Sequence, residues 1–310
     1  KQQKENIIDI SPLEFFNSEH MKQLRYDMLK ENISPLIQDT CYKCLINEQN
    51  TGNSKRLQNL YTTRDDKVDV LKQSTLKKIS ENKDVNLTPT DMDSFKIKIF
   101  GNLCNLKCTM CNPNASSKIA AEFKKYGEWN KPAIINPSKH MNMNKFLDDL
   151  KIVLPTTNQI EIVGGEPFLY PETFDLVNWI VENDLAKNLE IRFVTNGMTE
   201  NFDLFSLFKY FKQVTVMFSV DGFGKKDEYI RTGTNWEEKV MLMKNVAQIP
   251  KVKMSFSTTT QLLNIGYLDE IHDFITKTFG ITPRLNNGLS FPNWARAVNV
   301  PKDIANKIEA

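Results

Sequence analysis

The sequence predicts an α/β fold in which parallel strands alternate with helices. Six runs with strand-like alternation of apolar and polar residues follow one another from residue 95 onward, and helix-like runs separate them. Strands joined by helices through right-handed crossovers form a parallel sheet. The 310 residues are also enough for one large domain and a smaller one. We therefore expect an incomplete parallel (β/α)6 TIM-like barrel with a small, mostly helical amino-terminal cysteine module.

The first 90 residues are polar and have a helical pattern. Apolar residues recur at helical spacing within 21–30, whereas 61–90 is charged and poor in large apolar groups and should be a connecting segment. The chain opens on Lys1, so we expect a missing upstream piece. The expected domains are an amino-terminal module with its linker, a barrel and a carboxy-terminal tail, at 1–90, 91–290 and 291–310.

The barrel elements follow in order along the chain. The candidate strands are 95–100, 159–163, 189–195, 213–220, 251–258 and 281–287. The candidate helices are 115–126, 143–153, 172–184, 201–211, 236–248 and 267–278. The stretch 129–142 contains a tryptophan and two prolines and should be an inserted loop.

The strands alternate in polarity, although parallel strands buried on both faces usually read as continuous apolar runs. Lys96 and Lys98 alternate with apolar neighbours in the first strand, and Glu190 and Arg192 do so in the third. We expect the apolar face to pack under the helices and the polar face to line an open lumen that receives a charged substrate. The alternative is a plain sheet with one solvated face.

Composition narrows the class of protein. Lysine and arginine number 40 against 38 acidic residues, so the net charge of +2 gives no indication of nucleic acid or an anionic membrane as partner. No apolar run approaches the roughly 20 residues that span a bilayer. The five cysteines lie in two close groups, which indicates metal ligands in a reducing compartment, and we expect a cytoplasmic protein.

Three of these cysteines, Cys104, Cys108 and Cys111, share a short loop after the first predicted strand. Two would indicate a redox pair, and four a closed zinc site. Three, with no fourth cysteine or histidine nearby, suit an iron–sulfur cluster that leaves one iron open for a ligand.

Other predicted strands end in residues suited to ligand binding. Gly164 and Gly165 end the second strand and let a ligand approach the backbone, the Glu166 carboxylate accepts from an ammonium, and Pro167 stiffens the turn. An ordinary strand-to-helix turn is the alternative. At the third strand, the hydroxyl and amide of Thr195-Asn196 lie where parallel sheets bind ligands, although Asn-Gly is also a common turn.

The fourth strand ends in Ser219, on its polar face, and Arg231 follows. The planar guanidinium of an arginine pairs bidentately with carboxylates. Asp221 lies between Ser219 and Arg231 in the sequence and directly precedes a glycine, and we interpret it as a turn residue.

The spacing Cys104-X3-Cys108-X2-Cys111 after a strand, followed by Gly164-Gly165-Glu166-Pro167, resembles the signature of the radical S-adenosylmethionine (SAM) enzymes. The resemblance implies that the three cysteines hold a [4Fe-4S] cluster whose open iron is chelated by SAM. An electron from the cluster splits SAM to a 5′-deoxyadenosyl radical, which abstracts hydrogen from a substrate. A small electron donor such as flavodoxin or ferredoxin is implied as partner.

The same resemblance implies a binding site for SAM. Its implied members are Met110, Gly164, Gly165, Glu166, Pro167, Thr195, Asn196, Ser219 and Arg231. Glycines and glutamate would bind the amino group, and Ser219 and Arg231 the carboxylate. Many members carry an aromatic residue where this chain has Met110, whose polarisable sulfur would lie on the adenine.

Cys41 and Cys44 fit zinc, a redox pair or a second cluster. Their surroundings resemble the end of an amino-terminal twitch or SPASM-like module, in which two further upstream cysteines complete an auxiliary [4Fe-4S] cluster. No cysteine precedes Cys41, so either an upstream piece is missing or the pair binds something else.

Twitch-like modules often accompany peptide or protein modification, so we expect such a substrate; a nucleotide or sugar is the alternative. Two rival functions remain from the sequence. One is a non-catalytic iron–sulfur electron-transfer protein, and the other is a zinc-stabilised binding module.

Overall fold

The computed structural model describes residues 12–29, 33–52, 54, 86, 88–98, 100–289 and 292–308. The chain divides into two units. One comprises Lys1–Met92 with Met141–Thr156, and the other Asp93–His140 with Thr157–Ala310. Most of the predicted linker at 61–90 lies outside the described residues.

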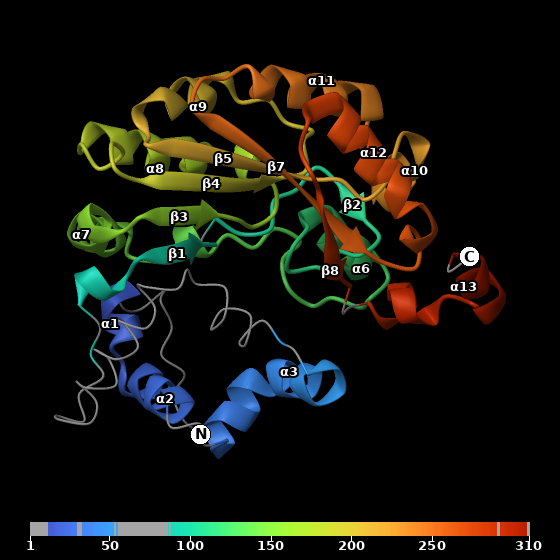
Figure 1. The fold of residues 1–310 in the computed structure, drawn as a ribbon. Coiled ribbons are helices and arrows are strands. Elements are labelled where there is room, and N and C mark those ends of the chain that lie inside the picture. Colours follow the sequence, from blue (N-terminus) through green and yellow to red (C-terminus); the bar gives the residue numbers. More distant parts are fainter. Residues whose placement is uncertain are drawn as a thin grey trace. The chain divides into compact units, whose positions relative to one another are not determined.

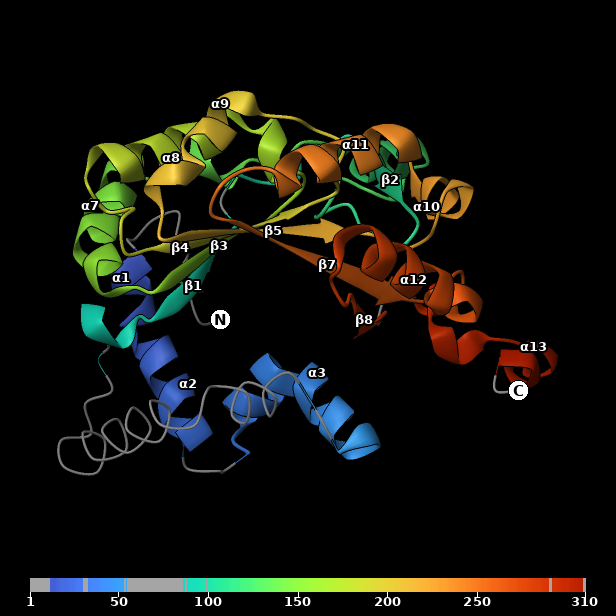
Figure 2. The ribbon, with the colours of Figure 1, turned by 45° about the horizontal axis from the view of Figure 1, so that its top comes forward.

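The second unit is built on a six-stranded parallel sheet, in the order β1-β3-β4-β5-β7-β8 (Figures 1 and 2). Its strands are β1 (Ser94–Ile97), β3 (Gln159–Ile162), β4 (Glu190–Thr195), β5 (Gln213–Ser219), β7 (Val252–Thr260) and β8 (Arg284–Gly288). A small antiparallel pair joins β2 (Lys107–Cys108) to β6 (Arg231–Thr232). The prediction of six parallel strands in an α/β fold is confirmed.

The second unit contains helices between these strands and one helix after the last of them. They are α6 (Ser117–Lys125), α8 (Pro171–Glu182), α9 (Phe202–Ser206), α10 (Lys225–Ile230), α11 (Trp236–Ala247), α12 (Leu268–Phe279) and α13 (Lys302–Ile308). Figure 2 shows α8, α9, α11 and α12 along one face of the sheet. That face carries the fully buried strand residues, among them Ile191, Phe193, Val216 and Phe218, so the core lies between sheet and helices.

Short 3₁₀ turns complete the described elements. They are Pro89–Asp91, Pro137–Lys139, Leu154–Thr156, Pro167–Leu169, Phe208–Tyr210, Ile265–Tyr267, Asn293–Ala295 and Ala297–Asn299. The predicted helix 201–211 is wrong in its length, because it breaks after α9 into a 3₁₀ turn. There the i,i+3 spacing lets Phe205, Phe208 and Phe211 all point into the core.

Strand β8 begins three residues later than the predicted 281–287. Pro283 precedes it, and proline has no N–H to donate to a strand ladder. The first strand likewise ends at Ile97, the last residue that pairs with β3.

The other face of the sheet carries a polar row that shares one register across five strands. Its members are Lys96, Glu161, Arg192, Thr215 and Lys253. Glu161 accepts a hydrogen bond from Lys96 Nζ at 2.6 Å and lies 3.6 Å from Arg192 Nη1. The predicted separation into an apolar and a polar face is therefore present, and an ion-pair network partly neutralises the polar one.

The first unit is helical in its described part. Its helices are α1 (Pro12–Phe16), α2 (Glu19–Leu29), α3 (Pro35–Thr51) and α7 (Met143–Val153). Ser34 caps α3 by accepting from Ile37 N, and Gly52 ends it in a left-handed conformation. The Asp149 carboxylate of α7 accepts from Leu13 N at 2.7 Å and so holds α1. Among all described helices, none has the length and apolar character of a membrane span.

Candidate functional site

The loop that follows β1 packs its three cysteines into one small cluster. Cys104 and Cys108 are buried with Leu106, while Cys111 and Met110 pack against them at the edge. Met110, which the sequence assigns to an adenine ring, is thus in contact with the cysteine cluster itself. The loop therefore presents all three thiols from a single compact turn.

The β2–β6 pair holds the middle of this loop. Cys108 lies directly opposite Arg231 in the antiparallel register. Thr109 N continues the ladder by donating to Ile230 O at 2.9 Å. A backbone ladder thus fixes Arg231 beside the second cysteine, although the two are far apart in sequence.

Three polar residues that the sequence analysis missed anchor the rest of the loop. Ser117 Oγ accepts from Cys104 N at 3.2 Å, and Ser116 Oγ donates to Leu106 O at 2.8 Å. Asn102 is fully buried and donates to Pro113 O at 2.8 Å. Ser116 had a detectable signal as the N-cap of α6, whereas nothing local marks Asn102.

The thiols differ in how readily they ionise. The hydrogen bond from Cys111 lowers the pKa of Cys108 to about 7, although burial opposes this. The same bond raises the pKa of Cys111, and burial raises that of Cys104. The thiolate is the metal-binding form, and the hydrogen bond from Cys111 favours it at Cys108.

The three thiols match the protein ligands of a multi-iron cluster. Nowhere in the described ranges do three His, Cys, Asp or Glu side chains converge at the spacing of one metal ion. In a [4Fe-4S] cluster each cysteine binds a different iron, so such convergence is not required. Three thiols on one loop, beside the cationic Arg231, match that donor set.

The Gly164–Pro167 turn presses against the cysteine loop. Glu166 N donates to Leu103 O at 2.8 Å. Gly165 has φ +54°, and a Cβ built on it would lie 2.1 Å from Leu103 O. The turn therefore needs glycine for two reasons, the left-handed backbone and the close approach of another backbone.

Gly165→Ala is expected to lower the free energy of unfolding of the metal-free protein by about 2–5 kcal/mol. The left-handed conformation costs an alanine about 1–2 kcal/mol, and overpacking typically costs about 1–3 kcal/mol more. Chemical denaturation followed by circular dichroism measures the change.

Gly280→Ala is the matched control, because Gly280 has φ +67° in the left-handed conformation and no atom of the described residues within 4 Å of the added Cβ. It should show the conformational cost alone, about 1–2 kcal/mol. Equal destabilisation by the two substitutions would contradict the close approach of Gly165 to the cysteine loop.

Glu166 is fully buried and joins the ends of β3 and β4. Its Oε1 accepts from Thr195 Oγ1 at 2.8 Å and from Phe168 N at 3.2 Å, and its Oε2 accepts from Asn196 N at 2.7 Å. Burial raises its pKa to about 7 despite these donors. The carboxylate that the sequence offers to an ammonium group thus already has three protein donors, and Pro167 begins the 3₁₀ turn that follows.

Arg231 has donor capacity left over. Its Nη1 donates to Asp221 Oδ2 at 2.7 Å, while its Nε is buried without a hydrogen-bond partner among the described residues. Burial lowers the pKa of Arg231, but Cys108, Asp221 and Asp227 together raise it above its usual value. An unsatisfied buried donor next to the thiols marks a place where an anionic group would be stabilised.

Asp221 is not the turn residue that the sequence suggested. It is buried, orients Arg231 through Oδ2 and accepts from Thr259 N at 2.6 Å through Oδ1. Its own N–H donates to Asp227 Oδ1 at 2.9 Å. Asp227 in turn forms a fully buried ion pair with Lys239, whose Nζ also donates to Ser219 O at 2.9 Å.

These contacts bring most of the predicted site residues together. The three cysteines, Met110, Gly164–Pro167, Thr195, Asn196 and Arg231 are linked through the hydrogen bonds and packing given above, and half-buried Ser219 ends β5 nearby in that network. Cys41 and Cys44 lie on α3 in the first unit, both partly exposed. The residues in which a twitch-like module would begin lie outside the described ranges.

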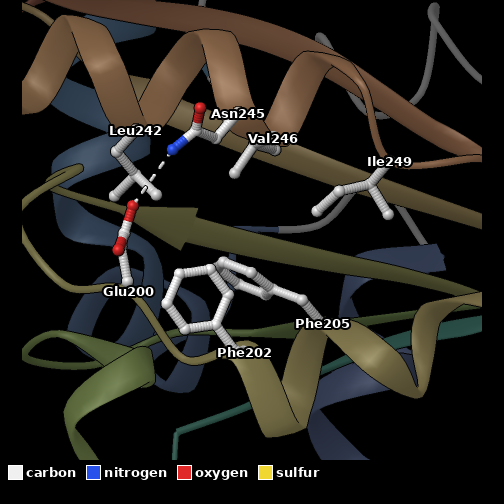
Figure 3. A pocket seen from close by; sticks show the side chains of 7 residues that line it. All are labelled: Glu200, Phe202, Phe205, Leu242, Asn245, Val246 and Ile249. Carbon is white, nitrogen blue, oxygen red and sulfur yellow. Dashed lines mark hydrogen bonds between the residues drawn. The ribbon is translucent and has the colours of Figure 1, made fainter.

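A separate hollow of about 270 Å³ lies between α9 and α11 (Figure 3). Leu242 and Val246 of α11 face Phe202 and Phe205 of α9 across it, and Asn245 Nδ2 donates to Glu200 Oε1 at 3.3 Å. None of the predicted site residues lines this hollow.

Comparison with known proteins gives one family match. Residues 98–277 match the model of the Radical SAM superfamily. One similar solved structure is native anSMEcpe with bound AdoMet, which has 19% sequence identity to this chain and a TM-score of 0.46. The match covers 59% of this chain and 49% of the anSMEcpe chain. A second is Streptococcus suis SuiB bound to S-adenosylmethionine, with 15% sequence identity and a TM-score of 0.42. That match covers 83% of this chain and 53% of the SuiB chain.

The chain thus spans about half the length of these two solved structures. The search of curated proteins found no match.

Proposed function

This chain belongs to the radical SAM superfamily, whose model matches more than half of it, and we propose that it cleaves SAM reductively to modify a substrate. The observation that carries the proposal is the packing of Cys104, Cys108 and Cys111 on one loop, with Arg231 in register beside Cys108. A three-thiol site with a neighbouring cation suits a cluster that must also receive an anionic ligand.

Cys104, Cys108 and Cys111 would hold a [4Fe-4S] cluster in this site. When bound, the cluster supplies the electron that splits SAM into methionine and a 5′-deoxyadenosyl radical, which takes hydrogen from the substrate. The protein's own task is to orient its ligands and exclude competing reactions.

Arg231 is assigned to the carboxylate of SAM. Its buried Nε has no hydrogen-bond partner in the described part of the chain, and its Nη1 is held by Asp221, so the guanidinium is oriented before a ligand arrives. Ser219, at the end of β5, would share that carboxylate, and the Gly164–Gly165 backbone would receive the amino group. Met110 would lie near the adenine, and Thr195 and Asn196 would border the cofactor.

Glu166 has a supporting role in this proposal. With three protein donors on its carboxylate, it fixes the β3 and β4 ends relative to each other. Pro167 rigidifies the turn that follows it. The arrangement keeps the glycine backbone pressed against the cysteine loop, where SAM would bind.

The substrate is proposed to be a peptide or protein. Support comes from the resemblance of the Cys41–Arg56 stretch to a twitch-like module, in which Cys41 and Cys44 would bind an auxiliary [4Fe-4S] cluster completed by upstream cysteines. A small ferredoxin or flavodoxin would deliver the electron, as expected of a protein in a reducing, cytoplasmic compartment.

The proposal predicts that the anaerobically reconstituted protein forms 5′-deoxyadenosine. Iron, sulfide, dithionite and SAM are added, and nucleosides are separated by chromatography. Product should appear with the iron–sulfur form and be missing from a parallel sample loaded with zinc, because zinc has no redox chemistry.

A fully loaded cluster that neither binds SAM nor yields 5′-deoxyadenosine would contradict the proposal and favour an electron-transfer protein. Stoichiometric zinc without sulfide in the isolated protein would instead favour a zinc-stabilised binding module.

A further inference from the structure

We propose that Asn196 is a positioning residue for the cluster, whose side-chain amide donates a hydrogen bond to the Cys104 sulfur and raises the reduction potential of the cluster. The inference rests on the proposed function, because it assumes that Cys104 is a cluster ligand. The sequence assigns Asn196 to SAM, but the contacts of its amide point to the cysteine.

Asn196 lies directly after β4 and is only 6% exposed. Its Nδ2 is 3.7 Å from Cys104 Sγ and 2.7 Å from Asn105 Oδ1. The two N–H groups of one amide therefore serve two neighbouring residues of the cysteine loop. This contact joins residues 92 positions apart and fixes the first cysteine from the side of the sheet.

The orientation of this amide is determined by its partners. Met198 N donates to Asn196 Oδ1 at 2.9 Å, so the oxygen must face Met198 and the nitrogen must face the cysteine loop. Asn105 is fixed in the same way, because its Nδ2 donates to Met198 O at 3.4 Å and Thr199 Oγ1 at 3.3 Å. Turning either amide over would place donor against donor.

The backbone of Asn196 is held in place by hydrogen bonding, as its side-chain amide is. Its N–H donates to Glu166 Oε2 at 2.7 Å, and Glu166 is fully buried. The donor on Cys104 is therefore preorganised by a buried carboxylate on one side and by Asn105 on the other. A hydrogen bond of this kind needs no rearrangement when the charge on the sulfur changes.

A donor on a ligand sulfur has a definite effect on redox chemistry. Reduction adds negative charge that spreads onto the cysteine sulfurs, and an N–H donor stabilises that charge. The reduced form is favoured, so the potential rises. Removing the donor should move the midpoint potential to more negative values and make reduction by a given donor less complete.

The test compares wild type, Asn196→Leu and Ser117→Ala after anaerobic reconstitution. Ser117 contacts the backbone N of the same Cys104 at 3.2 Å, so it controls for general loosening of the loop. The midpoint potential is measured by EPR-monitored titration without SAM, at equal iron and sulfide content. We expect a more negative midpoint for Asn196→Leu only; a midpoint equal to wild type would overturn the inference.

A second measurement uses the wild type alone, in case Asn196→Leu does not retain a cluster. With asparagine labelled by ¹⁵N at the side-chain amide, pulsed EPR of the reduced cluster should detect a weakly coupled nitrogen. Its absence would overturn the inference. Neither result bears on 5′-deoxyadenosine formation by the wild type, which tests the proposed function separately. A wild-type protein that holds no cluster would overturn both the proposed function and the inference about Asn196.

Discussion

Replacing Cys108 with alanine is expected to abolish 5′-deoxyadenosine formation and to remove the iron that the Cys104–Cys111 loop would bind. Cys108 lies in β2 at the centre of the thiol cluster, and the hydrogen bond from Cys111 lowers the pKa of its thiol. Loss of residues that merely support metal ligands costs roughly 10–100-fold in affinity or activity, so loss of a ligand should exceed about 100-fold. Iron analysis and chromatography of the reconstituted variant measure both effects.

Cys44→Ala is the matched control, because it removes a cysteine of the other unit. It should retain SAM cleavage in the absence of substrate, whatever iron it loses. Wild-type 5′-deoxyadenosine from Cys108→Ala would contradict the assignment of this loop as the cluster site. Equal loss in both variants would show that SAM cleavage depends on the first unit too.

Replacing Lys239 with methionine is expected to destabilise the metal-free protein by about 3–5 kcal/mol, the usual cost of leaving one buried charge without its partner. Lys239 Nζ lies 2.6 Å from Asp227 Oδ2, and both side chains are 0% exposed. Burial lowers the pKa of Lys239, as expected for an ammonium removed from water. The measurement is the midpoint of chemical denaturation.

Two further variants test the cause of this destabilisation. Lys225→Met removes a lysine of the neighbouring α10 that is 92% exposed, and it should leave the midpoint unchanged because exposed ion pairs contribute little. Adding Asp227→Leu to Lys239→Met should recover much of the loss, since no charge is then buried alone. A wild-type midpoint for Lys239→Met would contradict the buried ion pair.

Elements with local signals could be predicted from the amino-acid sequence alone. Alternation with a period of two marked the strands, and all six lie within three residues of their predicted bounds because each packs one face on helices. Cysteine spacing marked the loop proposed to hold the cluster, because its three cysteines lie within eight positions of one another. Gly164 and Gly165 at the end of β3 were detectable because their positive φ angles are conformations that glycine adopts without strain.

The identity of the polar residues that support the site depends on the three-dimensional packing of the chain. Asp221 resembled a turn residue in sequence, yet the fold places it between Arg231 and Thr259 in the interior. Asn196 acts through Cys104, which is 92 positions away, and Asn102 through carbonyl groups that the folded loops bring close to it. A buried polar group must find donors and acceptors wherever the packed core supplies them, and that supply depends on the whole topology rather than on neighbours in the chain.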